Sequence, residues 1–216
     1  ALQGAKADGR KFIPEAIGRG AVAILAPLGT RLNQQSKAKG SVSLIACNNP
    51  RLAYAVLSAR YFGSQPKIVA AITGTNGKTS CVELISQIAQ LVNYQCGYIS
   101  TIEISFDGKA VNHSSLLTTP DPISLQNYFY LMVEENTLQV AFEVSSHGLD
   151  QHRVIGTSID TAILTSFSQD HLDYHKNIEK YKKAKKKLFY ELKPKNIILN
   201  TDNILGKEIF KDLLTN

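Results

Sequence analysis

The chain has 216 residues, of which 44% are hydrophobic and 19% are charged, a balance that excludes general disorder and suits one or two packed domains. No apolar run approaches the roughly 20 residues that cross a bilayer, so a membrane-spanning protein is not expected. The formal net charge is +6, but residues 176–195 carry nine Lys and two Glu, or +7, which leaves −1 for the remainder. A uniformly basic nucleic-acid-binding protein is therefore excluded.

The first part of the chain alternates short apolar runs with helical patterns. Strands are predicted at 21–26 and 41–46, and helices at 14–19 and 51–62. The Gly-Ser-Gln-Pro segment at 63–66 then indicates a linker. We therefore expect two domains, at 1–65 and 66–216.

After the linker the alternation becomes regular. The patterns predict strands at 67–73, 97–101, 138–144, 161–167 and 196–200, and helices at 78–92, 122–135 and 178–192. Strands that alternate with helices form βαβ units, and these units build a parallel sheet with helices on both faces. The sequence therefore predicts an α/β fold, in which ligands bind at the carboxyl ends of the strands.

A loop of small residues joins the strand at 67–73 to the helix at 78–92, and it reads Gly74-Thr75-Asn76-Gly77-Lys78-Thr79-Ser80. Small residues let backbone N–H groups approach phosphate oxygens, and the helix N-terminus adds partial positive charge. Lys78 is suited to neutralise the β- and γ-phosphates, and the Thr79 hydroxyl is suited to bind Mg²⁺. The loop is shorter than the common G-x-x-x-x-G-K-[ST] pattern, but its place between a strand and a helix predicts an ATP site.

Acidic and histidine side chains follow two of the later strands. Glu143 lies near the end of the strand at 138–144, where its carboxylate could complete a Mg²⁺ site beside Thr79. A helix-capping or core-edge role is the alternative. The strand at 161–167 is followed by Asp170-His171-Leu172-Asp173-Tyr174-His175. A dedicated zinc site is not expected there, because no second cluster would complete the coordination shell.

One lysine of the basic run differs from its neighbours in its position on the helix. On a helical wheel, Lys185 shares the apolar stripe of Tyr181, and the lysines interpreted as solvent-facing are Lys182, Lys183, Lys186 and Lys187. Burial lowers the pKa of a lysine and leaves a neutral amine, which could capture CO₂ and become a carbamate that binds Mg²⁺. A lysine that snorkels at the edge of the stripe is the alternative.

Several of these segments, in the same order, resemble the Mur ligase superfamily. The loop at 74–80 resembles its ATP loop, the string at 143–153 resembles its MurE branch, and the string at 181–189 resembles its motif with a carboxylated lysine. The resemblance implies an ATP-dependent amide ligase that works through an acyl phosphate. It assigns catalysis to Lys78 and Lys185, and it assigns two Mg²⁺ ions to Thr79, Glu143, His171 and Lys185.

The same resemblance implies where a UDP-sugar peptide would bind. The implied contacts are Ala5, Lys6 and Ala7 in a uridine-binding N-terminal domain, then Thr118 and Thr119, then Ser145, Gln151 and Arg153. Leu117 departs from the family pattern, which usually has Asn at this position. The implied substrates are ATP, UDP-MurNAc-L-Ala-D-Glu and a diamino acid, with meso-diaminopimelate favoured over lysine.

The resemblance further implies a monomeric, cytoplasmic enzyme of bacterial peptidoglycan synthesis. Three cysteines without CxxC spacing agree with a reducing compartment. The family's C-terminal Rossmann-like domain, which binds the incoming amino acid, has no counterpart in this sequence, so the chain is expected to be truncated and unable to form the amide bond alone. Two other functions stay open: a superfamily ligase similar to folylpolyglutamate synthase, and a non-catalytic nucleotide-binding module.

Overall fold

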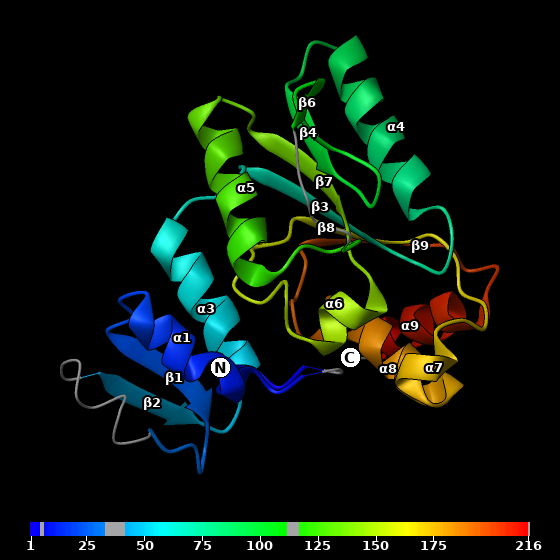
Figure 1. The fold of residues 1–216 in the computed structure, drawn as a ribbon. Coiled ribbons are helices and arrows are strands. Elements are labelled where there is room, and N and C mark those ends of the chain that lie inside the picture. Colours follow the sequence, from blue (N-terminus) through cyan, green and yellow to red (C-terminus); the bar gives the residue numbers. More distant parts are fainter. Residues whose placement is uncertain (5–6, 33–41, 112–116, 216) are drawn as a thin grey trace. The chain divides into compact units, whose positions relative to one another are not determined.

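The computed structural model describes residues 1–4, 7–32, 42–111 and 117–215 (Figure 1). The chain forms two compact units, Ala1–Leu57 and Ser58–Asn216, which divide inside a helix and upstream of the predicted linker at 63–66. Within the described ranges, no helix is both long enough and apolar enough to cross a membrane.

The N-terminal unit is a small α/β assembly. It contains the 3-10 helix η1 (Gly9–Phe12), α1 (Ile13–Gly18), β1 (Ala23–Pro27), β2 (Ser43–Cys47) and the first part of α3 (Pro50–Phe62). The two strands pair in parallel, with Leu25 opposite Ile45. Its buried core consists of Ile13, Ile17, Ile24 and Ala26. The strands and helices predicted for this unit are confirmed, with their ends displaced by no more than two residues.

The larger unit is built on one seven-stranded sheet in the order β6-β5-β4-β7-β3-β8-β9. Its strands are β3 (Ile68–Thr73), β4 (Cys96–Ile99), β5 (Ile104–Phe106), β6 (Lys109–Val111), β7 (Gln139–Glu143), β8 (Thr161–Leu164) and β9 (Asn196–Leu199). Its helices are α4 (Lys78–Leu91), α5 (Pro122–Glu134), α6 (Ser146–Asp150), α7 (Leu172–His175), α8 (Ile178–Tyr190) and α9 (Ile204–Leu214). Five strands run parallel, and β5 and β6 form an antiparallel hairpin at one edge. The predicted α/β fold is therefore confirmed.

The central strands bury both of their faces, because successive side chains of a strand point to opposite sides of the sheet. Val69 and Ala71 of β3 and Phe142 of β7 belong to a large core that includes residues of α5, α8 and α9. Ile72 and Ala141 belong to a smaller core against α4. Figure 1 shows α4 and α5 on opposite sides of these strands. Helices on both faces hold the strand ends in fixed positions.

The sequence patterns did not predict α6, α7, α9 or the β5–β6 hairpin, and α9 changes the interpretation of the lysine run. Lys182 is 9% exposed, and its Nζ lies 2.6 Å from Oε1 of Glu208 on α9. Lys186 Nζ lies 3.3 Å from Oδ2 of Asp212 on the same helix. The prediction that these two lysines face solvent was wrong, because α9 covers them with carboxylates. It was also wrong for Lys187, whose side chain is 17% exposed and whose Nζ lies 3.6 Å from Asp150 Oδ1. Lys183 is exposed, as predicted.

The order of the strands brings three loops together. β7, β3 and β8 are adjacent and parallel, so their carboxyl ends lie at the same edge of the sheet. The phosphate-type loop follows β3, Glu143 ends β7, and the segment at 165–171 follows β8. Residues far apart in the sequence therefore meet where parallel α/β sheets bind ligands.

Candidate active site

The loop between β3 and α4 has a backbone that only glycine allows at two positions. Gly77 caps α4 with a φ of 83°, in the left-handed region that favours glycine. A Cβ on Gly74 would lie 2.0 Å from Oγ1 of Thr165, in the segment after β8. The small residues that marked this loop in the sequence are thus required for its close contact with the neighbouring strand end.

The segment after β8 holds the loop through hydrogen bonds. The backbone N–H of Thr75 donates to the Ser166 carbonyl (3.0 Å), and that of Asn76 donates to Ser166 Oγ (2.9 Å). Thr165 Oγ1 donates to the Asn76 carbonyl (2.7 Å). These two N–H groups are therefore engaged within the protein. The first-turn N–H groups of α4, beginning at Lys78, have no partner inside the helix and are suited to face an anion.

Two lysine amines meet at one backbone oxygen of the loop. Lys78 Nζ donates to the Gly74 carbonyl (3.1 Å) and to the Thr75 carbonyl (3.0 Å). Lys185 Nζ, from α8, donates to the same Gly74 carbonyl (2.8 Å). Lys185 is 1% exposed, and its Nζ lies 4.8 Å from the centre of the Tyr181 ring. The predicted inward position of Lys185 is confirmed.

The surroundings lower the pKa of both amines. Burial lowers the pKa of Lys78, although Glu143 and Asp170 oppose this change. Burial, together with the nearby charge of Lys78, lowers the pKa of Lys185 to about 7, again against the effect of Asp170. An amine with such a pKa is largely unprotonated just above neutral pH, so it is available as a nucleophile. Asp170, which the sequence reasoning did not assign to the site, partly opposes the lowering of both pKa values.

A hydroxyl and a carboxylate lie together beside the loop. Thr79 Oγ1 donates to Glu143 Oε1 (2.7 Å), and Glu143 is 1% exposed. Glu143 also accepts hydrogen bonds from the backbone N–H of Thr101 (2.9 Å) and from its hydroxyl (3.3 Å). This set of hard oxygen donors fits Mg²⁺. Thr101 was not predicted, since nothing in its sequence context marks it.

His171 lies in the segment after β8, beside the rings of His147 and Tyr181. Its backbone is left-handed (φ 52°), and its half-exposed ring lies 5.0 Å from that of His147 and 6.1 Å from that of Tyr181. Tyr181 is also the ring beneath Lys185. Within the described ranges, no three His, Cys, Asp or Glu side chains gather closely enough to hold a metal. A metal here would therefore depend on Thr79 and Lys185 as well.

The residues expected to contact a peptide substrate form a connected network. Arg153 donates to the Thr119 carbonyl (2.7 Å) and to Gln151 Oε1 (3.0 Å). Gln151 Nε2 donates to the Tyr174 hydroxyl (3.2 Å), which itself donates to Asp150 Oδ2 (3.0 Å). Tyr174 and Asp150 were not predicted, because their role depends on the approach of α7 to α6.

Thr119 and Ser145 meet beside this network. The buried hydroxyl of Thr119 donates to the Glu143 carbonyl (3.1 Å) and lies 3.1 Å from Ser145 Oγ. Ser145 Oγ also accepts from the backbone N–H of Gly148 and thereby caps α6. The neighbouring Thr118 is half-buried.

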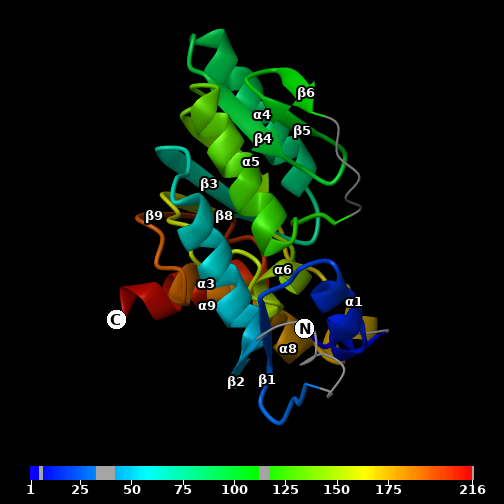
Figure 2. The same cartoon turned by 60° about the vertical axis from the view of Figure 1, so that its left-hand side comes forward.

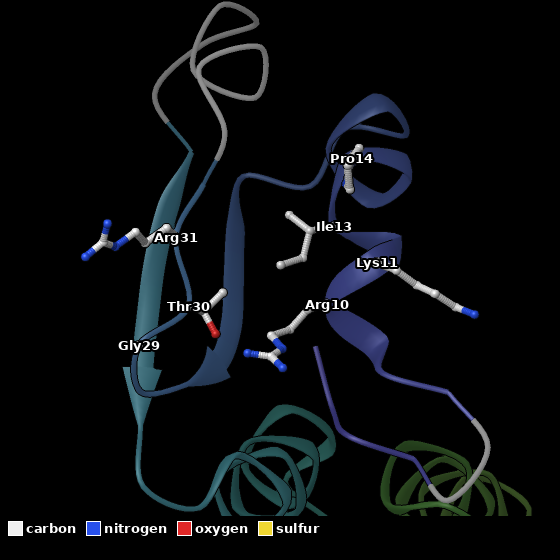
Figure 3. Close-up of a pocket in the computed structure, with 7 residues that line it drawn as sticks. All are labelled: Arg10, Lys11, Ile13, Pro14, Gly29, Thr30 and Arg31. Carbon is white, nitrogen blue, oxygen red and sulfur yellow. The ribbon is translucent and has the colours of Figure 1, made fainter.

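The N-terminal unit contains a separate cavity of about 350 Å³. Figure 3 shows that Arg10, Ile13 and Thr30 point into the space between the helices and β1, whereas Lys11 and Arg31 point away. Asp8 accepts a hydrogen bond from Arg10 Nε (2.8 Å). Of the predicted uridine contacts just upstream, Ala7 is half-buried, and Ala5 and Lys6 lie outside the described residues. Figure 2 turns the view of Figure 1 by 60°, so that α1, β1 and β2 of this unit come forward.

Known proteins that are similar to this chain include Mur ligases. The Mur ligase middle domain family matches residues 72–215. A UDP-N-acetylmuramoyl-L-alanyl-D-glutamate–2,6-diaminopimelate ligase from Bradyrhizobium diazoefficiens is 42% identical over 197 residues, which are 90% of this chain and 38% of that protein. The ligase of the same name from Zymomonas mobilis is 42% identical over 192 residues, which are 88% of this chain and 37% of that protein.

A solved structure that carries the same ligase name aligns with a TM-score of 0.78 and 28% identity, over 96% of this chain and 40% of that one. The chain thus spans about two fifths of the length of the relatives it matches. Because the middle-domain match covers more than half of the chain, we conclude that this protein belongs to the Mur ligase family.

Proposed function

We propose that the whole protein is an ATP-dependent amide ligase of the MurE type, which adds diaminopimelate to UDP-MurNAc-L-Ala-D-Glu. ATP phosphorylates the γ-carboxylate of the terminal D-glutamyl residue. The amine of diaminopimelate then attacks the acyl phosphate and displaces phosphate. The names of the relatives support this activity and the choice of diaminopimelate.

The observation that carries the proposal is the meeting of Lys78 and Lys185 at the Gly74 carbonyl, 3.1 and 2.8 Å away. Lys78 turns from the loop carbonyls to the β- and γ-phosphates of ATP and stabilises the charge that develops during transfer. The remaining residues of the loop at 74–80 surround the phosphates.

The amine of Lys185 is the group that forms a carbamate. Its nitrogen attacks the carbon of CO₂, so that an N–C bond forms while one C=O π bond opens and leaves its electron pair on oxygen. One proton passes from the nitrogen to water, and the neutral amine becomes an anionic carboxylate equivalent. That anion, with Thr79, Glu143 and His171, would hold two Mg²⁺ ions. When bound, Mg²⁺ neutralises charge on the phosphate oxygens. The oxygen donors of Thr79 and Glu143 already lie 2.7 Å apart, which supports their assignment to this role.

The two predicted domains divide the substrates between them. Residues 1–65 bind the uridine end through Ala5, Lys6 and Ala7, and residues 66–216 bind ATP. The peptide end contacts Thr118, Thr119, Ser145, Gln151 and Arg153, since Arg153 has the planar fork that suits a carboxylate. The enzyme works as a monomer in the bacterial cytoplasm.

The test measures phosphate release and UDP-tripeptide formation by the full-length protein. The assay contains ATP, Mg²⁺ and UDP-MurNAc-L-Ala-D-Glu, with diaminopimelate or lysine as the amine. Lys78→Ala should abolish both products, whereas the exposed Lys67→Ala should leave them unchanged. Turnover with a pteroate substrate and glutamate would instead indicate a folate-type ligase. ATP binding without any amide product would indicate a nucleotide-binding module.

A further inference from the structure

A cavity of the larger unit lies beside the peptide-contact network described above, with which it shares Asp150 and Tyr174. Its volume is about 510 Å³, and its walls come from α6, α7 and α8, namely Asp150, Tyr174, His175, Lys176, Lys180, Lys183, Ala184 and Lys187. This volume falls in the range of about 300–1,000 Å³ that small-molecule sites occupy. Seven of the eight lining residues carry a polar or charged group, and four of these are lysines, so the cavity offers several charged groups to a polar ligand.

The charge of this lining is strongly positive. Four lysines face one carboxylate, that of Asp150. Lys187 Nζ lies 3.6 Å from Asp150 Oδ1, and the Tyr174 hydroxyl donates to Asp150 Oδ2 (3.0 Å), so this carboxylate is compensated. Nε2 of the His175 ring forms a hydrogen bond with Ser146 Oγ (2.9 Å). Three lysine charges therefore remain without a balancing carboxylate in the lining.

Two of these lysines stand apart from the other lysines of α8. Lys180 and Lys183 are exposed, and within the described ranges neither ammonium group has a hydrogen-bond or ion-pair partner. They lie three residues apart, on one face of the helix, where like charges repel each other. Lys176 is also exposed, and its Nζ donates to the Asp173 carbonyl (3.0 Å). An anion in the cavity would relieve the repulsion between these groups.

We propose that this cavity, the α8 lysine pocket, binds a polyphosphate anion, either a chain of inorganic phosphate or the phosphate tail of a nucleotide. Lysine binds phosphate as a flexible point charge, and charges spread along a helix favour a ligand with several phosphates. The charge outside 176–195 sums to −1, so the attraction is local rather than spread over a surface that could follow a nucleic acid. The pocket does not share lysines with the ATP loop, so this proposal stands apart from the proposed ligase activity.

The experiment titrates inorganic tripolyphosphate into the full-length protein by isothermal calorimetry. All proteins carry Lys78→Ala, and the buffer contains no Mg²⁺, so that binding at the ATP loop is suppressed. The pocket variant is Lys180→Glu with Lys183→Glu. The matched control is Lys207→Glu with Lys211→Glu, which reverses two exposed charges on α9. Guanosine triphosphate is titrated in a parallel series.

We expect the pocket variant to bind tripolyphosphate at least tenfold more weakly and the control to change less than twofold. The milder Lys180→Gln with Lys183→Gln should fall between them, and circular dichroism should show unchanged folding for all. Equal affinities for the two probes would indicate a phosphate chain as ligand, and tighter binding of the nucleotide would indicate a nucleotide. The proposal is overturned if the protein that carries Lys78→Ala alone does not bind either probe. It is also overturned if the pocket variant and the control variant lose affinity equally.

Discussion

The lysines of α8 occupy three different environments within one helix. Lys185 is 1% exposed and bonds to the phosphate-type loop. Lys182 is covered by α9 and bonds to Glu208. Lys183 is exposed beside the α8 lysine pocket. The comparison teaches that the neighbouring element, rather than the residue type, decides whether a lysine is a nucleophile, a structural cation or a free charge.

The pKa values of two of these lysines move in opposite directions for this reason. Burial beside Lys78 lowers the pKa of Lys185 to about 7. The hydrogen bond to Glu208 raises the pKa of Lys182, although partial burial opposes it. Lys185 lies beside a carbonyl and an aromatic ring, neither of which carries a full negative charge. These contacts therefore stabilise the charged amine less than the water that it loses on burial.

The largest expected effect is the loss of activity in Lys185→Ala. If this amine carries the carbamate, kcat/KM for phosphate release should fall by about 10²–10³-fold, the cost of removing one stabilising group in a preorganised site. Lys183→Ala, on the exposed face of the same helix, should retain near-normal activity. Equal losses of kcat/KM in the two variants would contradict the inference that Lys185 and Lys183 lie in different environments.

The pH dependence of stability should sharpen the contrast. The pKa of Lys185 is about 7 in the folded protein against an ordinary value of 10.5, so between these pH values the unfolded chain binds more protons. This group therefore makes stability rise with pH, by up to about 1.4 kcal/mol per pH unit. Urea unfolding at pH 7, 8 and 9 in CO₂-free buffer should show a smaller rise for Lys185→Met than for Lys183→Met.

Breaking the pair of Lys182 and Glu208 should have a smaller effect. Lys182→Met and Glu208→Gln, combined in a double-mutant cycle, should give a coupling of about 1 kcal/mol, because the pair is only partly buried. Partial burial raises the pKa of Glu208, but its bonds to Lys182 and Lys186 outweigh this and lower it below 4.5. The coupling should therefore persist above pH 4.5 and disappear as the pH falls through the lowered pKa. A coupling that is no larger at pH 7 than at the lowest pH at which the protein stays folded would refute the ion pair.

The smallest expected effect concerns Tyr174, which bonds to both Gln151 and Asp150. Tyr174→Phe removes both hydrogen bonds. Only the bond to Gln151, worth about 1 kcal/mol, orients a predicted substrate contact, so KM for the UDP-peptide substrate should rise roughly two- to tenfold. The KM for ATP and kcat should change little, since Tyr174 positions substrate contacts and is not placed among the phosphate groups. The exposed Tyr94→Phe serves as the control. A parallel rise in KM for ATP would show a general structural loss instead.

Much of the fold and part of the site could be predicted from local pattern. The strand before Gly74, the small residues of the loop and Lys78 lie next to one another in the sequence, and a phosphate loop is a local structure. The inward face of Lys185 followed from helical periodicity, because a helix repeats its faces whatever packs against them. Thr101, Asp170 and Tyr174 were not predicted, since their contacts come from residues remote in the chain.

The sequence by itself thus determined the α/β alternation, the phosphate-type loop and the helix face on which Lys185 lies, because each depends on residues within a few turns of the chain. Only the tertiary structure decided that Lys185 and Lys78 share the Gly74 carbonyl, and that α9 pairs Lys182 while leaving Lys183 exposed. Those outcomes depend on strand order and helix packing. Lys78 and Lys185 are separated by more than a hundred residues, and Lys182 and Glu208 are separated by a βα unit. No local sequence pattern predicts contacts between residues so far apart in the chain.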